Sequence, residues 1–308
     1  MNPRILLTGS NGQVGYELER LLHRVGEVVA LDRSQLDLSN PAEIRRKIQE
    51  IHPNLIVNAA AYTAVDKAES DAAAAQAINA DAPGIMAQEA KKIGAGLVHY
   101  STDYVFDGSK ESPYEEDDQP NPASIYGRTK LAGEQAIRDA GGTHLILRAA
   151  WVYATRGRNF LLTVLRLAAQ REELRIVNDQ LGAPTWCREI AEATTSILER
   201  RYRGSDDARG LEPVSGTYHL TASGVTTWFG FAQAILEEIS SPPPPWAETA
   251  TGGRPLIAHR IVPIATSEYP TPAHRPAYSV LSNSRLAQTF GIQLPDWRAQ
   301  LQSAITLR

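Results

Sequence analysis

The sequence predicts a doubly wound α/β fold, in which helices cover both faces of a parallel sheet, with a smaller and discontinuous C-terminal domain. Short apolar runs without polar alternation, typical of strands buried on both sides, recur at residues 5–7, 28–31, 55–57, 97–100 and 145–148. Segments with apolar residues at helical spacing separate these runs, and such alternation indicates parallel strands with right-handed crossovers. We expect residues 1–150 to form the sheet domain and 151–308 mainly the second domain, with segments near 186–240 returning to the sheet.

The composition is that of an ordinary globular protein, with 43% hydrophobic and 21% charged residues in a chain of 308. A net charge of -4 and a pI near 6.0 give no indication of a nucleic-acid partner. The chain enters a strand pattern directly after Met1-Asn2-Pro3-Arg4, and no apolar run reaches the ~18 to 20 residues that cross a bilayer. Cys187 is the only cysteine, which excludes an internal disulfide. We therefore expect a cytoplasmic protein without a signal peptide or a membrane partner.

A glycine-rich turn, Gly9-Ser10-Asn11-Gly12-Gln13-Val14-Gly15, follows the first predicted strand and leads into a predicted helix. Gly9 would permit the tight turn, Gly12 would let backbone N–H groups approach a pyrophosphate, and Gly15 would let the helix pack on the strand. The spacing is Gly-x-x-Gly-x-x-Gly, which differs from the Gly-x-Gly-x-x-Gly of many dehydrogenases. Strand, glycine turn and helix in immediate succession predict a Rossmann-type dinucleotide-binding domain.

Asp32 and Arg33 end the second predicted strand. An acid at this point can accept hydrogen bonds from the adenosine ribose hydroxyls of a dinucleotide. Asp32 alone would repel the 2′-phosphate of NADPH, whereas Arg33 could pair with it, so NADH and NADPH both stay open. Asp37 and Leu38 follow in a loop, where Asp37 could meet the adenine edge or cap the helix that begins near Pro41.

Small and polar residues follow the third and fourth predicted strands. Ala61-Tyr62-Thr63 would allow a cofactor to lie close to the backbone. Ser101-Thr102-Asp103 ends the fourth strand, where a hydroxyl can hydrogen-bond a reacting carbonyl oxygen; a turn without catalytic duty is the alternative. Because ligands of doubly wound sheets bind beyond the carboxyl ends of the strands, these segments should meet at one site.

Tyr126 and Lys130 are four residues apart in a predicted helix, so they share one helix face. A phenol has an ordinary pKa of roughly 10 and is a poor acid or base at neutral pH. A nearby ammonium group favours the phenolate, and we expect Lys130 to lower the pKa of Tyr126 towards the working range. The alternative is an ordinary helix face.

Taken together, these motifs resemble those of the extended short-chain dehydrogenase/reductases. Longer strings are similar to one group of that family, the dTDP-4-dehydrorhamnose reductases, at residues 57–69, 99–106, 178–185 and 269–276. The resemblance runs from Arg4 to about Trp297. It implies NAD(P)H-dependent reduction of the 4-keto group of a dTDP-sugar, the last step of dTDP-L-rhamnose synthesis. The rhamnose would enter lipopolysaccharide or another surface glycan.

The same resemblance implies roles for individual residues. Tyr126 would donate a proton to the C4 oxygen, Lys130 would bind the nicotinamide ribose, and Thr102 would hydrogen-bond the C4 oxygen. The positions that match dinucleotide contacts are Gly12, Gln13, Val14, Asp32, Asp37, Leu38, Ala61, Tyr62 and Thr63. Those that match contacts to the sugar nucleotide are Val65, Thr102, Asp103 and Trp151.

Two residues of the second half have competing interpretations. Trp151 follows the fifth strand and could close over a sugar face or fill the core at a domain junction. Arg275 could bind a diphosphate bidentately or be a surface arginine.

The resemblance also raises the question of a metal, since some members of the family use Mg²⁺ at a dimer contact between acidic residues. Glu17 and Glu189 match two of these positions, but Arg298 stands where a third acid is expected. This departure argues against both the metal and that dimer, and we predict no metal site. A monomer and a homodimer both stay open.

Two other functions compete with simple reduction. A sugar-nucleotide 4,6-dehydratase of the same family carries a Glu after the Thr-Asp pair, where this chain has Tyr104, and an epimerase would retain its NAD throughout the cycle. A non-catalytic NAD(P)-binding subunit often lacks the Tyr or the Lys, and both are present here.

Overall fold

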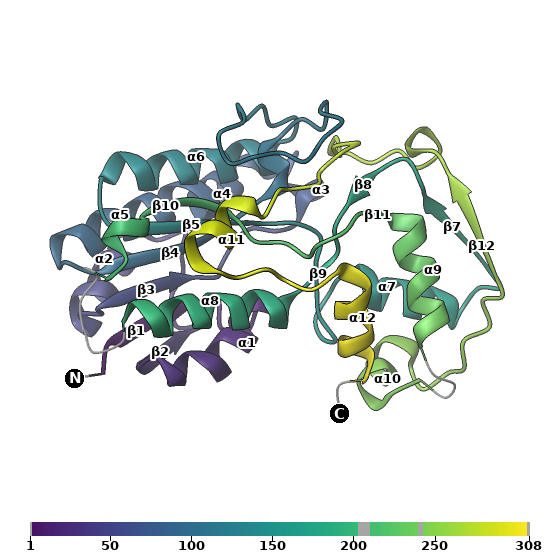
Figure 1. Cartoon of the computed structure of the whole chain (residues 1–308), viewed down its shortest axis with the longest axis horizontal. Helices are drawn as coiled ribbons and strands as arrows, with labels where there is room; N and C mark the ends of the chain where they lie inside the picture. The colour runs from purple at the N-terminus through teal and green to yellow at the C-terminus, as the bar shows by residue number, and fades with distance from the viewer. Residues whose placement is uncertain (1, 203–209, 240–242, 307–308) are drawn as a thin grey trace.

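The computed structural model describes residues 2–202, 210–239 and 243–306. Within this part of the chain the centre is a six-stranded sheet of order β10-β5-β4-β3-β1-β2, in which all neighbours are parallel (Figure 1). Its strands are β1 (Arg4–Thr8), β2 (Glu27–Leu31), β3 (Leu55–Asn58), β4 (Gly96–Thr102), β5 (His144–Ala149) and β10 (Gly216–His219). The strand order reverses between β1 and β3, and this switch point is where doubly wound sheets bind ligands. The predicted fold class is confirmed.

Helices cover both faces of the sheet. On one face, α1 (Gln13–Leu21) and α8 (Cys187–Arg201) pack together, and Leu18 and Ile190 meet the apolar side chains of β1, β3 and β5 there. On the other face, α5 (Ala82–Lys92) packs between α2 (Pro41–Ile51) and α6 (Ile125–Ala140). The short helical segments of this part are η1 (Leu22–Arg24), α3 (Val65–Ala68), α4 (Ala72–Gln76), the π-helical turn η2 (Ala77–Asp81), η3 (Asp103–Val105), η5 (Glu212–Val214) and α11 (Ser284–Phe290).

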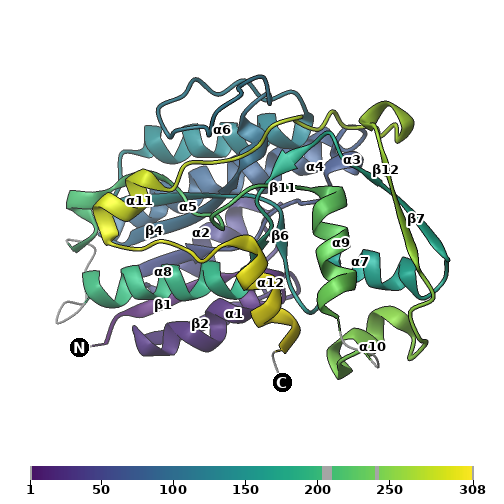
Figure 2. The same ribbon diagram turned by 45° about the vertical axis from the view of Figure 1, so that its right-hand side comes forward.

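A smaller part with its own apolar core lies beyond the carboxyl ends of the strands (Figure 2). Its helices are α7 (Phe160–Ala168), α9 (Trp228–Glu238), α10 (Pro245–Thr251) and α12 (Trp297–Thr306), with the turn η6 (Thr266–Glu268). Three two-stranded pairs complete it: β7 (Glu173–Val177) with β12 (Arg260–Ile264), β8 (Leu181–Gly182) with β11 (Thr226–Thr227), and β6 (Val152–Tyr153) with β9 (Thr185–Trp186).

The chain passes between the two parts several times. After β9 it returns to the sheet part with α8 and β10, and α11 adds Leu286 and Phe290 to the core there. The expectation that the helix at 228–239 also returns to the sheet is wrong. The Phe231 and Ile235 side chains of α9 are fully buried in the core of the smaller part, because the apolar face of α9 packs against that of α7.

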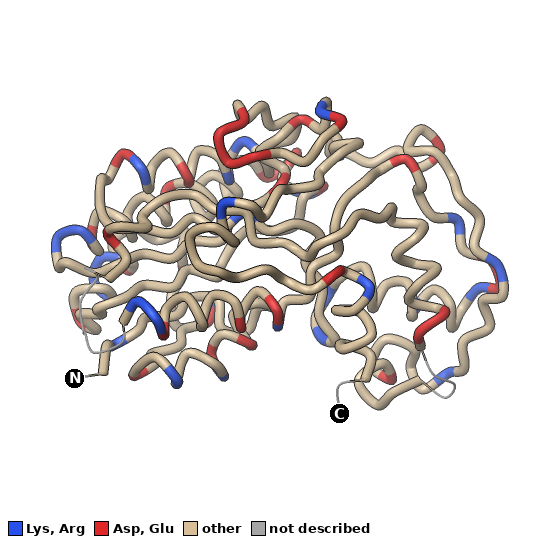
Figure 3. Tube along the Cα trace, viewed as in Figure 1, with Lys and Arg blue, Asp and Glu red and all other residues tan. Residues whose placement is uncertain are grey.

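Figure 3 shows residues of both charge signs interspersed along the described backbone. Glu115, Glu116, Asp117 and Asp118 form a short acidic run in the loop before α6. No helix among the described residues is both long enough and apolar enough to cross a membrane.

Candidate active site

A cavity of about 730 Å³ opens at the carboxyl ends of the strands, above the switch point between β1 and β3. The glycine turn, the end of β2, the loop after β3 and the face of α6 line it. The predicted cofactor residues that line it are Gly9, Gly12, Gln13, Val14, Asp32, Arg33, Asp37, Leu38, Ala61, Tyr62, Thr63, Tyr126 and Lys130. Gly15 is not part of the lining.

The glycines of the turn allow close backbone packing beside the cavity. Gly9 has φ +74°, and a Cβ at this position would lie 2.7 Å from the Ala60 nitrogen. At Gly15 a Cβ would lie 2.0 Å from the Gly9 carbonyl oxygen, so Gly15 lets α1 pack on the turn. Gly12 precedes α1 and has no side-chain cap, which leaves the first N–H groups of the helix facing the cavity mouth.

The two acids on the β2 side are held as carboxylates by neighbouring donors. The Ser34 hydroxyl and backbone N–H donate to Asp32, as does the Asn11 amide at 2.6 Å, and these hydrogen bonds lower the pKa of Asp32. The backbone N–H and hydroxyl of Ser39 lower the pKa of Asp37 in the same way. The alternative role of Asp37 as a helix cap is wrong, because Asn40 caps α2 by accepting from the N–H groups of its first turn.

Tyr126 lies at the start of α6, which Ser124 caps by accepting from the Gly127 N–H at 3.1 Å. The Tyr126 ring is 9% exposed and meets the edge of Tyr104 at 5.5 Å between centroids. The prediction that Lys130 lowers the pKa of Tyr126 is wrong in this structure. Burial raises the pKa of Tyr126 to about 12, and a hydrogen bond with Thr102 only partly offsets it. The phenol therefore keeps its proton at neutral pH.

Lys130 is 1% exposed and points along the end of β4. Its Nζ donates to the Tyr100 carbonyl oxygen at 2.5 Å and lies 3.2 Å from Nε2 of His99. Burial lowers the pKa of Lys130 to about 8, against the opposing charge of Glu134. Nζ of Lys130 is thus directed at His99 and Tyr100, and Lys130 is not among the groups that shift the pKa of Tyr126.

Thr102 and Asp103 form one buried unit beside Tyr126. The Thr102 hydroxyl donates to Oδ1 of Asp103 at 2.9 Å, and Asp103 is 2% exposed. Burial raises the pKa of Asp103 from its ordinary 3.8 to about 6, while the Thr102 hydrogen bond opposes the rise. Oδ2 of Asp103 is buried without a hydrogen-bond partner among the described residues, and the nearby Ser279 side chain also opposes the rise of the Asp103 pKa.

Neither Thr102 nor Asp103 is part of the cavity lining, and the same holds for the other predicted sugar-nucleotide residues, Val65, Trp151 and Arg275. Val65 packs in the same apolar cluster as Tyr126 and Tyr104. Arg275 makes a bidentate ion pair with Asp66, with N···O distances of 2.9 and 3.2 Å.

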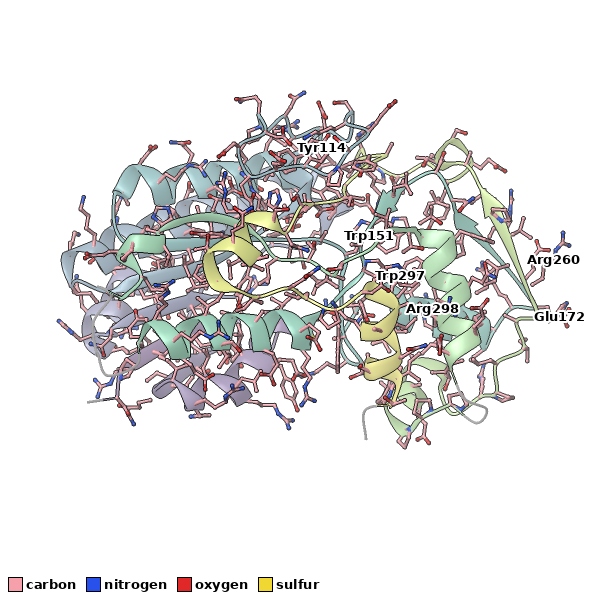
Figure 4. The ribbon with its side chains drawn as sticks, in the orientation of Figure 1. Tyr114, Trp151, Glu172, Arg260, Trp297 and Arg298 are labelled. Carbon is pink, nitrogen blue, oxygen red and sulfur yellow. The ribbon has the colours of Figure 1, made fainter. Side chains whose placement is uncertain are left out.

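Trp151 lies where the sheet meets α9 (Figure 4). Its ring stacks on Trp228 at 3.5 Å between centroids, and its backbone has the unusual φ of +48°. This is the domain-junction position that was one of its two interpretations.

Several lining residues were missed by the sequence analysis, above all the loop Arg156-Gly157-Arg158. Arg156 stacks on the Tyr16 ring of α1 at 3.6 Å from the centroid, and its Nη1 is buried without a hydrogen-bond partner. Asn159 ties this loop to the glycine turn by donating to Oε1 of Gln13 at 3.0 Å. Two arginines flanking a glycine before a helix were the available signal. The other missed lining residues include Asn11, Lys67, Tyr100 and Ser101.

The three positions considered for a metal are Glu17 on α1, Glu189 on α8 and Arg298 on α12. No group of three or more His, Cys, Asp or Glu residues in the described ranges could hold a metal ion. Arg298 instead makes ion pairs with Glu237 at 2.7 Å and Glu238 at 3.0 Å, on the neighbouring helix α9.

Fold and site together define a Rossmann-type nucleotide-binding protein with a Tyr-Lys pair at the cavity edge. Comparison with known proteins narrows this class. The chain belongs to the family described as RmlD substrate binding domain, which it matches over residues 3–307. It is 52% identical over 295 residues to a dTDP-4-dehydrorhamnose reductase of Burkholderia thailandensis, covering 96% of this chain and 95% of the relative. The corresponding protein of Escherichia coli K12 is 43% identical over 298 residues, covering 96% and 94% of the two chains.

Solved structures show the same relationship. The crystal structure of a dTDP-4-dehydrorhamnose reductase from Clostridium acetobutylicum has a TM-score of 0.86 at 36% identity, covering 98% of both chains. That of the Bacillus anthracis protein, in complex with NADP, has a TM-score of 0.85 at 32% identity and covers 99% of both. A UDP-glucose 4-epimerase of Thermus thermophilus, at 20% identity and a TM-score of 0.74, shares the fold.

Proposed function

We propose that this protein reduces the 4-keto group of dTDP-4-dehydro-L-rhamnose to give dTDP-L-rhamnose, with NADH or NADPH as the reductant. The observation that carries the proposal is the position of the Tyr126 phenol beside Thr102, at the edge of a cavity that the glycine turn and Asp32 also line. Relatives that share 41 to 52% of their residues with this chain over nearly its whole length have this reductase name.

The chain's own residues fit a dinucleotide. A Cβ at Gly12 would lie 3.1 Å from the Gly9 oxygen, so this position favours glycine. Because glycine has no side chain, a pyrophosphate can approach the start of α1. The Nη1 of Arg156, which has no partner among the described residues, would donate to the same phosphates. Asp32 would accept from the adenosine ribose, and the exposed Arg33 is available to a 2′-phosphate.

The chemistry requires a hydride and a proton on the two ends of the C4 carbonyl. Bound NAD(P)H supplies the hydride. Tyr126 holds the proton at its phenol oxygen and donates it to the C4 oxygen. The Thr102 hydroxyl would turn from Asp103 to donate a hydrogen bond to the same oxygen. A pKa of about 12 keeps the Tyr126 proton in place at neutral pH until charge develops on the C4 oxygen. General acid catalysis of this kind contributes roughly 10²- to 10⁴-fold.

Recognition of the sugar nucleotide would use residues around Tyr126. The unpaired Oδ2 of Asp103 accepts a sugar hydroxyl, and Val65 packs against the sugar ring. Arg275 would leave Asp66 to bind the diphosphate, and Trp151 would border the sugar at the junction of the two parts.

We also propose a cytoplasmic enzyme, in line with its one, buried cysteine. It would act as a monomer or a homodimer, which light scattering after size-exclusion chromatography distinguishes.

The test is the absorbance of the reduced nicotinamide after dTDP-4-dehydrorhamnose is added to the purified protein. We expect oxidation of NADPH or NADH in step with formation of dTDP-L-rhamnose. Folded protein that oxidises neither cofactor would contradict the proposal. Tightly bound NAD in the purified protein, with sugar interconversion and no net oxidation, would instead indicate an epimerase.

A further inference from the structure

A row of polar side chains crosses the buried end of the sheet. Thr8 of β1 is in register with Asn58 of β3, and Asn58 is in register with His99 of β4. Partners in register on parallel strands project from the same face of a sheet, so the three side chains lie side by side. Each is at most 1% exposed. Lys130 of α6 ends the row, with its Nζ 3.2 Å from Nε2 of His99.

The direction of the hydrogen bonds is set at Asn58. The backbone N–H of Ala60 is a donor that cannot reverse, and it donates to Oδ1 of Asn58 at 3.2 Å. The Thr8 hydroxyl donates to the same oxygen at 2.7 Å. The amide nitrogen of Asn58 therefore faces Nδ1 of His99 at 3.0 Å and must be the donor there. Nδ1 of His99 is then an acceptor and carries no proton.

A neutral imidazole with a bare Nδ1 carries its proton on Nε2, and this N–H points at Nζ of Lys130. Burial lowers the pKa of His99 well below its usual value, so the ring stays neutral. An ammonium group at Lys130 would place two donors against each other. An amine accepts from His99 through its lone pair and still donates to the Tyr100 carbonyl oxygen at 2.5 Å.

The charged groups around Lys130 do not reverse this preference. Glu134, one turn further along α6, is bound by the Arg148 guanidinium of β5 at 2.7 and 2.9 Å and by the Ser101 hydroxyl of β4 at 2.6 Å. Arg138, also on α6, lies 3.3 Å from Glu134, so two guanidinium groups already match the charge of Glu134. Burial raises the pKa of Tyr126 to about 12, so the phenol on the same face of α6 carries no charge at neutral pH.

We propose that His99 is a positioning residue whose Nε2–H favours the neutral amine of Lys130 over the ammonium in the cofactor-free protein. Binding of the nicotinamide dinucleotide draws Lys130 from His99 to the ribose hydroxyls, and the amine takes up one proton from solvent to become an ammonium. The Thr8-Asn58-His99 row thus links cofactor binding to the charge of Lys130. The inference rests on the proposed function only in the choice of cofactor.

The tautomer of His99 can be measured directly in cofactor-free protein by NMR on ¹⁵N-labelled histidine. The His99 signals are those lost in the His99→Gln variant. We expect a neutral ring with its proton on Nε2 throughout the neutral pH range. A proton on Nδ1, or an imidazolium, would overturn the proposal whether or not the protein reduces any sugar.

The proton uptake can be measured by calorimetric titration with NADPH in buffers of different ionisation enthalpy. About one pH unit above the Lys130 pKa of about 8, roughly 0.9 protons should be taken up for each NADPH bound. In His99→Gln the amide oxygen can accept from an ammonium, so we expect the uptake to fall several-fold. The control His144→Gln, at the opposite end of the sheet beside β4, should keep the wild-type value.

Equal uptake in wild type and His99→Gln, or none in wild type, would overturn the proposal. Absence of any cofactor binding would count against the proposed function, and the tautomer would still decide the role of His99.

Discussion

The sheet side of the site consists of Tyr126 on α6 and of Thr102 and Asp103 at the end of β4, and each of these residues is at most 9% exposed. Strand ends and the first turn of α6 hold these side chains. Arg156, Trp151 and Arg275 come from loops that follow the sheet, and other side chains hold them. Arg156 rests on Tyr16, and Arg275 is paired with Asp66.

The two groups of residues differ in how they are held, and we expect the first group to carry out the reaction and the second to bind the ligands. Groups fixed by backbone and buried hydrogen bonds keep one geometry, as a proton donor and its partners require. Groups held by side-chain contacts can exchange those contacts for a ligand at little cost, because partly exposed ion pairs contribute only ~0 to 1 kcal/mol. Substitutions on the sheet side should therefore change turnover, and those on the loop side should change binding.

The largest effect is expected for Tyr126→Phe. Removing the phenol oxygen removes the proton donor, so kcat should fall roughly 10²- to 10⁴-fold while the Kd for NADPH stays unchanged. Steady-state kinetics and fluorescence titration measure the two values. The control is Tyr153→Phe, which removes a buried hydroxyl that has no hydrogen-bond partner within the described residues. Near-normal turnover in Tyr126→Phe would exclude Tyr126 as the proton donor.

Asp103→Asn tests whether ionisation of the buried Asp103 carboxyl lowers the free energy of unfolding. Because burial raises the pKa of Asp103 from 3.8 to about 6, the folded state favours the protonated form, and the carboxyl weakens folding as pH rises through this range. The rise corresponds to roughly 3 kcal/mol at most. Relative to wild type, the free energy of unfolding of Asp103→Asn should increase by roughly 1 to 3 kcal/mol between pH 4 and pH 7 in urea titrations. A difference between the two proteins that does not change with pH would show that Asp103 ionises normally.

Arg156→Gln should weaken cofactor binding and leave kcat at saturating NADPH nearly unchanged. A charge-assisted hydrogen bond is worth roughly 1.5 to 3 kcal/mol, which is about 10- to 100-fold in Kd. Arg166→Gln, an exposed arginine on α7, is the control for the loss of one charge. Equal Kd values for the two variants would remove Arg156 from the cofactor site.

Arg275→Gln should give the smallest change. Arg275 must break its ion pair with Asp66 before it binds the diphosphate, and this cost reduces its net contribution to binding. We expect a rise in KM for the sugar nucleotide of about tenfold or less, with kcat and the Kd for NADPH unchanged. Asp66→Asn, which frees Arg275, should not raise that KM. A higher KM in both variants would mean that the ion pair only supports the local fold.

Local patterns accounted for much of the fold and of the cofactor side. The glycine turn, Asp32 and the Tyr126-Lys130 spacing each depend on neighbours in the sequence, so their positions follow from strand and helix periodicity. The cap of α2 is a near miss: Asn40, and not Asp37, stands directly before the first turn.

Long-range packing determined what the sequence did not reveal. Arg156 reaches the cavity because its loop is tied to Gln13, far away in the chain, and Trp151 meets Trp228 across the two parts. The raised pKa of Tyr126 depends on burial that no spacing predicts. His99 was a visible signal, as a polar residue within an apolar run, but its partners Asn58 and Lys130 become apparent only from the register of the strands.

The most direct test of the proposed reduction follows the hydride itself. NADPH that carries deuterium at both C4 positions of the nicotinamide is supplied with dTDP-4-dehydrorhamnose, and the sugar product is examined by NMR and mass spectrometry. The account predicts dTDP-L-rhamnose with a single deuterium at C4 of the sugar. Product without deuterium, or with deuterium at another carbon, would contradict it.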